Sequence, residues 1–169
     1  GETVNLNVND VLVIDGDLTI EPRGVLNGAS GSQIRVSGSW KNSGSYTHGN
    51  SSVYFTGSGV SQITGSNSFY NLISDFSRAD TSSGKTLTFE SGSSQSVVNQ
   101  LQIKGATSDN LVILSTLPGT TAYIDLNGAT FDVSNVSVKD NTALNVAGGA
   151  INPTGSVNSG NTENWFRID

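Results

Sequence analysis

Short runs of apolar residues, separated by stretches rich in Gly, Ser, Asn and Thr, extend along the whole chain. The apolar residues alternate with polar ones in Val4, Leu6 and Val8, and the alternation recurs in Ile34 and Val36. This is the spacing of β-strands, whose successive side chains point to opposite faces. The 3.6-residue periodicity of an amphipathic helix is nowhere sustained. The pattern therefore predicts an all-β chain of many short strands.

A degenerate repeat marks the ends of several apolar runs. It consists of an apolar residue, any residue, a glycine, and then serine or alanine, and it occurs at 26–29, 36–39, 55–58, 63–66, 103–106 and 126–129. Glycine adopts backbone conformations that other residues avoid, so it suits a corner where the chain changes direction. We interpret the repeats as solenoid corners, with ordinary hairpin turns as the alternative. Strands are expected at 4–8, 11–14, 18–20, 25–26, 34–36, 53–55, 69–73, 86–89, 97–103, 111–114, 122–126, 131–138 and 165–168.

The predicted fold is a single-domain parallel β-solenoid, or β-helix, over residues 1–169, and a β-sandwich is the alternative. Prolines and glycines at 118–119 and 153–155 mark loops, and no linker interrupts the pattern. If a coil contains roughly 20 residues and rises by about 4.8 Å, the chain forms about eight coils and a rod of about 40 Å.

The composition supports strands and restricts the choice of partners. Val and Ile together outnumber Leu by 26 to 12, which favours strands over helices. The net charge of −6 and the scattered basic residues argue against nucleic-acid binding, which needs clustered Lys and Arg. The chain has no cysteine and no apolar run near the length of a membrane helix, so we expect neither disulfides nor membrane insertion. This composition is compatible with an extracellular or cell-surface protein whose signal peptide is absent from the chain.

Aromatic residues, asparagines and glycines recur in a recognisable order. The segments are WKNSGSY at 40–46, SVYFTG at 52–57, QI at 62–63, FYNL at 69–72, VSVKD at 136–140, SGN at 159–161 and NWF at 164–166. This order resembles a recurrent β-solenoid module of large bacterial secreted and cell-surface, adhesin-like proteins. The resemblance implies a parallel β-solenoid within an adhesin or surface fibre, and it implies no catalytic residues. Ile73 and Ser74 depart from the alternation, because the alternating pattern would place the apolar residue second, at position 74.

Two short segments are candidates for metal binding. His48 is the only histidine, and neither a cysteine nor a second histidine can join it as a ligand, so we interpret it as a surface residue. Asp15 and Asp17 resemble half of a calcium-binding loop, but the strand-like sequence at 18–20 replaces the remaining ligands. A turn is the preferred interpretation, and we expect no metal and no cofactor.

Parallel β-helices also include enzymes that degrade polysaccharides, such as pectin lyases. These enzymes need clustered carboxylates together with Arg or Lys on one face. The candidates in this chain are Asp75, Arg78, Asp80 and Asp109, which lie in serine-rich sequence without a motif. Because a fold does not by itself supply an activity, we expect that the chain is not an enzyme.

Four aromatic residues, Trp40, Tyr46, Tyr54 and Tyr70, are candidates for a platform that binds sugars. Tyr54 and Phe55 are adjacent in a strand and must therefore face opposite ways. Packing in the core or in stacked ladders is the favoured interpretation for the group as a whole.

The expected function is a non-catalytic structural module of an extracellular surface, either a self-assembling fibre subunit or the stalk segment of an adhesin. A carbohydrate-binding module and a polysaccharide-degrading enzyme are the alternatives. The ends of a solenoid expose unpaired strand edges, and neither terminus of this chain resembles a cap. The expected partners are therefore second copies or further modules of the same parent protein, with glycans as further candidates. Residues expected at the assembly interface are Val4, Leu6, Val8, Trp165, Phe166 and Ile168.

Overall fold

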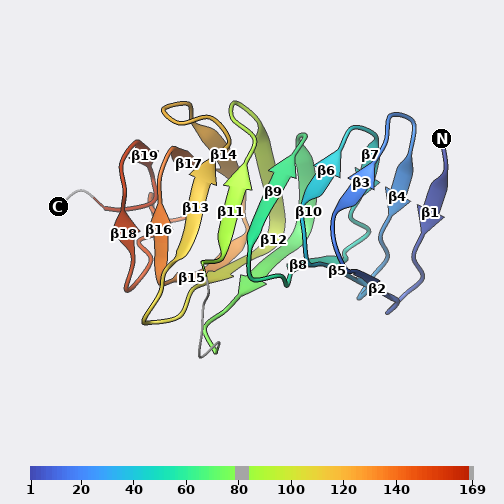
Figure 1. Ribbon diagram of the computed structural model, residues 1–169, viewed down its shortest axis with the longest axis horizontal. Coiled ribbons are helices and arrows are strands. Elements are labelled where there is room, and N and C mark those ends of the chain that lie inside the picture. Colours follow the sequence, from blue (N-terminus) through green and yellow to red (C-terminus); the bar gives the residue numbers. More distant parts are fainter. Residues whose placement is uncertain (79–83, 168–169) are drawn as a thin grey trace.

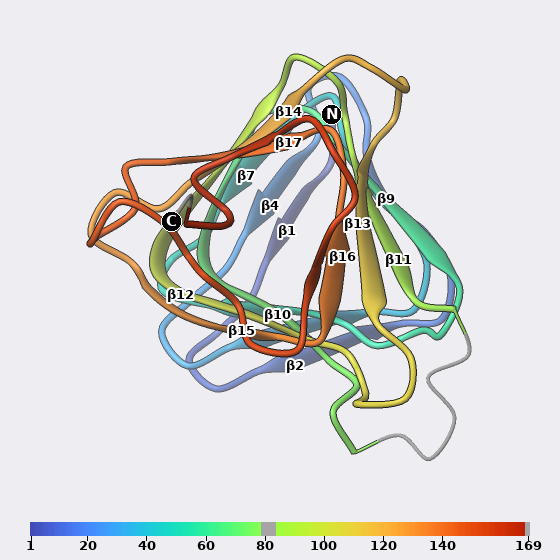
Figure 2. The same cartoon turned by 90° about the vertical axis from the view of Figure 1, so that its left-hand side faces the viewer.

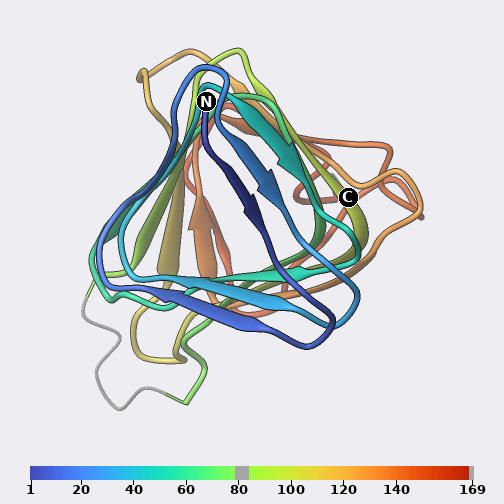
Figure 3. The same ribbon diagram turned by 90° about the vertical axis from the view of Figure 1, so that its right-hand side faces the viewer.

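The computed structural model describes residues 1–78 and 84–167, and every regular element within these ranges is a β-strand. The strands form three parallel sheets that wind into a three-sided β-solenoid, so the prediction of this fold is confirmed and the β-sandwich alternative is wrong. The coils are stacked along one axis, with the two termini at opposite ends (Figure 1). Views along this axis show a triangular outline (Figures 2 and 3).

Each coil contributes a segment to each of the three faces. The first face contains β1 (Thr3–Asn5), β4 (Val25–Asn27), β7 (Ser45–Thr47), the first halves of β10 (Asn67–Asp75) and β12 (Ser94–Lys104), β14 (Ala122–Asp125), β17 (Asn141–Leu144) and β19 (Thr162–Glu163). The second face contains β2 (Val11–Ile14), β5 (Gln33–Val36), β8 (Ser52–Phe55), the second halves of β10 and β12, and β15 (Thr130–Ser134). The third face contains β3 (Leu18–Ile20), β6 (Trp40–Asn42), β9 (Val60–Thr64), β11 (Thr86–Phe89), β13 (Leu111–Ser115), β16 (Val136–Val138) and β18 (Val157–Asn158).

The coils differ in length. The third face has seven strands, which correspond to seven coils rather than the expected eight. Asn71 and Ser52 are hydrogen-bonded between neighbouring coils at a separation of 19 residues, whereas Thr130 and Asn99 are separated by 31 residues. Because the longer coils contain more residues, the chain forms fewer coils. At about 4.8 Å per coil the rod therefore measures roughly 34 Å instead of about 40 Å.

Alternating side chains fill the interior, as the sequence pattern predicts. On the second face, Ile34 and Val53 are register partners in successive coils, and both are fully buried. On the third face, Trp40, Ile63 and Phe89 continue the core from coil to coil. Because each inward residue packs against its equivalents in the coils above and below, the core is a continuous stack.

The glycine repeats lie at corners, directly after the ends of β4, β5, β8, β9, β12 and β14. Gly57 explains why the residue must be small. A Cβ atom at this position would lie only 1.9 Å from the carbonyl oxygen of Ser37, in the neighbouring coil. The backbones of successive coils therefore touch at this corner, and a side chain would force them apart.

Several expected strands differ from the observed ones by up to three residues at an end, and three differ more. The first ends at Asn5 instead of residue 8, because the Asp10 carboxylate accepts a hydrogen bond from the Asn7 N–H (2.7 Å) and closes a turn. The range 131–138 forms two strands, β15 and β16, on either side of Asn135, whose φ of 51° makes a corner. Near the C-terminus the strand is β19, and Trp165 follows it instead of beginning a strand.

Ile73 and Ser74 reverse the usual order of apolar and polar residues. The side chain of Ser74 points into the interior and is 1% exposed, and its backbone is the register partner of Ile103. Ile73 lies beside Tyr54 on the outside of the second face and is half-buried. The departure seen in the sequence thus places an aliphatic side chain on the surface.

Candidate functional site

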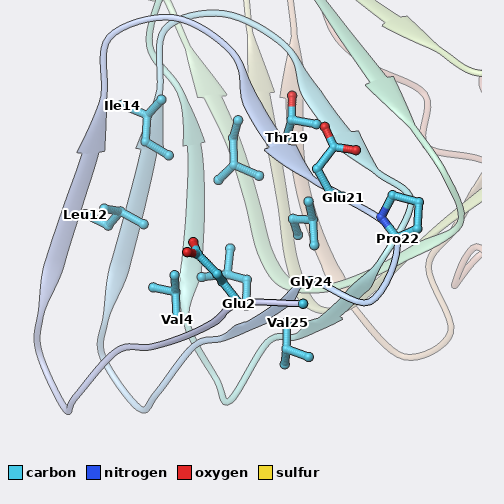
Figure 4. A pocket seen from close by; sticks show the side chains of 13 residues that line it. Glu2, Val4, Leu12, Ile14, Thr19, Glu21, Pro22, Gly24 and Val25 are labelled. Carbon is cyan, nitrogen blue, oxygen red and sulfur yellow. The ribbon is translucent and has the colours of Figure 1, made fainter.

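The N-terminal end of the solenoid contains an apolar hollow (Figure 4). Its volume is about 450 Å³ and its apolar lining comes from the first coil and the beginning of the second: Val4, Leu12, Ile14, Leu18, Ile20 and Leu26. Leu12 and Ile14 are only half-buried, whereas their register partners in the second coil, Ile34 and Val36, are fully buried. The difference arises because every inner coil is covered on both sides, whereas the described residues cover the first coil on one side only.

Two features surround this N-terminal hollow. The strands β1, β2 and β3 each stand last in their sheet, so within the described residues one backbone edge of each strand has no partner strand. Exposed carboxylates lie at the rim, from Glu2 and Glu21. An unpaired parallel edge around an apolar centre is a surface that a further β-coil can extend.

The predicted interface residues near the N-terminus have different environments. Val4 lines the N-terminal hollow and is 47% exposed. Leu6 is half-buried and packs against the core. Val8 lies in the turn after β1, is 64% exposed and is absent from the lining of the hollow. Val4 is therefore the residue of the three that a partner covering the hollow would contact most directly.

The C-terminal end is closed by the chain itself. Trp165 is fully buried and its Nε1–H donates a hydrogen bond to Oδ1 of Asn141 (2.9 Å). The backbone N–H groups of Ile151 and Asn152 donate to the carbonyl oxygens of Asn164 (3.0 Å) and Trp165 (2.8 Å). The indole therefore packs in the interior of the last coil, where it cannot contact a partner.

The other residues predicted at this end lie nearer the surface. Phe166 is half-buried, Arg167 is exposed, and both line a shallow depression of about 600 Å³ together with Glu163. Ile168 lies outside the described residues. The C-terminal end therefore presents one aromatic side chain and both signs of charge, in contrast to the hollow at the N-terminus.

No family model, curated protein or solved structure matches the chain. The parallel β-solenoid of about seven coils agrees with the fold that the resemblance implies. Membership of an adhesin-like family receives no support from these comparisons.

The candidate metal-binding residues form other contacts. Asp17 accepts hydrogen bonds from the Lys41 ammonium (2.6 Å) and the Ser39 N–H (2.8 Å), and these bonds lower its pKa. Asp15 accepts a hydrogen bond from the Ser37 hydroxyl (3.0 Å). Within residues 1–78 and 84–167, no group of three or more His, Asp or Glu side chains could hold a metal ion. The same residues contain no helix that is long and apolar enough to cross a bilayer.

The candidate carboxylates of a polysaccharide-degrading site do not share one set of contacts. Asp75 accepts hydrogen bonds from Ser77 and Gln102, whereas Asp109 accepts a long hydrogen bond from the Gly84 N–H (3.4 Å). Arg78 is exposed, and Asp80 lies outside the described residues. The described part of the candidate group thus makes separate local contacts rather than one catalytic cluster.

The four aromatic candidates divide between the core and the surface. Trp40 is fully buried, and its ring lies edge-on to Tyr46 at a centroid distance of 4.8 Å. Burial raises the pKa of Tyr46 to about 12, although a hydrogen bond with Ser51 partly offsets this effect. Tyr70 stacks on His48 at 5.7 Å, and Tyr54 lies on the outside of the second face. Tyr54 is thus the member of the group that borders a groove on the second face.

No motif in the sequence singles out Lys85, yet its side chain is buried and only 1% exposed. Its Nζ donates a hydrogen bond to the hydroxyl of Ser61 (2.7 Å) and lies 6.0 Å and 5.8 Å from the ring centroids of Phe55 and Phe76. Burial lowers the pKa of Lys85 to about 8. A serine next to a lysine is a pair used in nucleophilic catalysis, but Ser61 is 0% exposed and no substrate can reach it here.

Proposed function

We propose that the chain is a non-catalytic structural module of an extracellular surface, which extends a fibre or an adhesin stalk by stacking end to end. The N-terminal hollow is the observation that carries this proposal. It leaves Leu12 and Ile14 half-buried beside three strand edges that have no described partner. A further coil placed on this end removes the apolar side chains from water and completes the backbone hydrogen bonds of the edges.

The proposed occupant is the C-terminal end of a second copy. The chain winds in the same sense at both ends, so stacking a C-terminal end on an N-terminal end continues the parallel arrangement (Figures 2 and 3). Arg167 at the C-terminal depression is available to pair with Glu2 or Glu21 at the rim of the hollow. Two N-terminal ends would instead bring these carboxylates against each other.

Stacking of unlike ends is a heterologous contact, which leaves one free end of each kind after every addition. The contact therefore propagates into a filament unless a rotation closes it into a ring. In a longer chain, a further solenoid module of the same parent protein could cover the N-terminal hollow instead, because its end coil would present the same kind of strand edge as a second copy.

The composition supports placing this module outside the cell. The chain has no cysteine, only 13% charged residues, and surfaces rich in hydroxyl and amide groups. Side chains of these types form ladders between coils, such as the hydrogen bond from Asn27 to Asn5 (2.8 Å) and the one from Asn99 to Asn71 (2.7 Å). Such ladders are neutral and so do not depend on ionic conditions.

Replacing Val4 with lysine is expected to weaken self-association at least tenfold. The substitution places a charge over the N-terminal hollow, where it is desolvated on stacking and repelled by Arg167 of the next copy. Sedimentation velocity over a wide range of protein concentration measures the effect. We expect the wild type to form larger species as the concentration rises.

The matched control is Val98→Lys, in the fifth coil away from both ends, where the valine is 43% exposed compared with 47% for Val4. This variant is expected to associate like the wild type. A wild type that stays monomeric at every concentration contradicts the proposal, and so does an equal effect of the two substitutions.

A further inference from the structure

A second site lies on the side of the solenoid, independent of the ends. A groove of about 470 Å³ runs across β8, β10 and β12 on the second face, and its lining includes Tyr54, Ile73, Asp75, Phe76, Gln100 and Gln102. We call it the second-face groove. Register pairs Tyr54 with Ile73 and Ile73 with Gln102, so side chains from three successive coils stand in one outward column. The groove thus has a regular floor that the fold itself holds in place.

The aromatic part of this floor is fixed by its neighbours. The Arg35 guanidinium lies 5.3 Å from the centroid of the Tyr54 ring. Arg35 is itself held by two hydrogen bonds to Oε1 of Gln33, at 3.1 Å from Nε and 2.9 Å from Nη2. A ring positioned in this way needs little ordering when it packs against a ligand.

The polar part of the groove centres on Asp75. Its Oδ1 accepts hydrogen bonds from the N–H (2.9 Å) and hydroxyl (2.6 Å) of Ser77, and its Oδ2 accepts one from Nε2 of Gln102 (2.6 Å). Partial burial raises the pKa of Asp75, but the hydrogen bonds from Ser77 and Gln102 outweigh it, so the pKa lies below its ordinary value. The groove therefore contains an ionised carboxylate at neutral pH.

Several polar groups in the groove remain without partners within the described residues. They are the Tyr54 hydroxyl, the amide group of Gln100 and Oε1 of Gln102. Together they offer both donors and acceptors beside an aromatic and an aliphatic side chain. Two cations near the groove are already engaged, since Lys104 pairs with Asp132 (2.5 Å) and Arg35 binds Gln33.

From this arrangement we infer that the second-face groove binds a neutral glycan. A sugar ring presents an apolar C–H face that packs on Tyr54 and Ile73, and hydroxyl groups that donate to Asp75 and exchange hydrogen bonds with Gln100 and Gln102. An acidic glycan is disfavoured, because the ionised Asp75 repels it and neither Lys nor Arg is among the described residues that line the groove. The ladder of coils suits a chain of several sugars lying along the solenoid axis.

The test uses affinity electrophoresis of the purified protein in gels that contain one polysaccharide each: β-glucan, α-glucan, xylan, mannan, galactan or the acidic polygalacturonate. We expect at least one neutral polysaccharide to retard the protein, and polygalacturonate to retard it less. Tyr54→Ala and Gln102→Ala are each expected to weaken the interaction at least tenfold. Circular dichroism verifies that both variants keep the wild-type strand spectrum.

Tyr123→Ala is the matched control, since Tyr123 is also a half-buried tyrosine but lies in β14 on the first face. It is expected to bind like the wild type. The inference is overturned if no neutral polysaccharide retards the protein, if polygalacturonate binds best, or if Tyr123→Ala weakens binding as much as Tyr54→Ala. None of these outcomes bears on stacking at the ends, which Val4 tests separately.

Discussion

Replacing Gly57 with alanine is expected to lower the free energy of unfolding by about 2–3 kcal/mol, the cost of forcing an extra group into a packed site. The added Cβ would lie 1.9 Å from the carbonyl oxygen and 2.8 Å from the carbonyl carbon of Ser37. Both atoms belong to the backbone of the neighbouring coil and cannot rotate away. The two coils must therefore separate locally, which weakens the hydrogen bond from the Thr56 N–H to the Val36 carbonyl (2.9 Å).

Urea denaturation followed by tryptophan fluorescence measures this change, since Trp40 and Trp165 are both fully buried. Gly59→Ala is the control. No atom lies within 4 Å of a Cβ at Gly59, so this substitution is expected to change the free energy by no more than about 0.5 kcal/mol. Equal stability of the two variants would show that the corner does not bring the coils into contact.

The second large effect concerns the buried Lys85. Its pKa is about 8 in the folded protein, compared with an ordinary value of 10.5. Between these two pH values the unfolded chain binds more protons than the folded one, so the stability of the wild type rises with pH through this window. The gain across the whole window is about 3 kcal/mol, because each pH unit between the two pKa values corresponds to about 1.4 kcal/mol.

We expect the double variant Ser61→Ala/Lys85→Met to lack this gain. Methionine has a similar length without the charge, and alanine removes the hydroxyl that would otherwise be buried without its partner. The measurement is the free energy of unfolding at several pH values from 7 to 10.5, compared with that of the wild type. Lys139→Met, at an exposed lysine, is the control and should keep the gain of the wild type. If the free energy of unfolding of the wild type and of the double variant changed with pH in the same way, the lowered pKa of Lys85 would be contradicted.

The sequence predicts the fold well because its main signal is local. Alternation of side chains assigns Ile34, Val53 and Phe55 to the interior, and all three are buried. Glycine followed by a small residue predicts corners, and the structure has corners at these positions. The rule misses corners that use asparagine, such as Asn135 and Asn161, whose φ values are 51° and 52°. Asparagine tolerates this conformation, but it is too common in this chain to mark a corner by itself.

Polar residues in the interior could not be predicted in this way. Ser74 and Lys85 occur in sequence rich in serine, which is typical of exposed loops. Their burial depends on the register between coils, which places Ser74 beside Ile103 and Lys85 within reach of Ser61. A register between segments more than 20 residues apart is not encoded in any local pattern.

The same limit applies to the candidate sites. Tyr54, Ile73 and Gln102 come from three coils of unequal length, so the sequence does not reveal that they share one groove. From the sequence, both termini are predicted to be unpaired strand edges. In the structure, Trp165 is buried and closes one end. Whether a tryptophan near a terminus points inward depends on its partner, here Asn141, and only the folded chain supplies that partner.

Electron microscopy of the purified protein at increasing concentration tests the stacking proposal most directly. End-to-end stacking predicts rods of constant width whose lengths increase in steps of one solenoid, roughly 34 Å for seven coils at about 4.8 Å each. The Val4→Lys variant should give mostly single units under the same conditions. Single particles of about one solenoid length at every concentration of the wild type, or clusters without a common axis, would contradict end-to-end stacking.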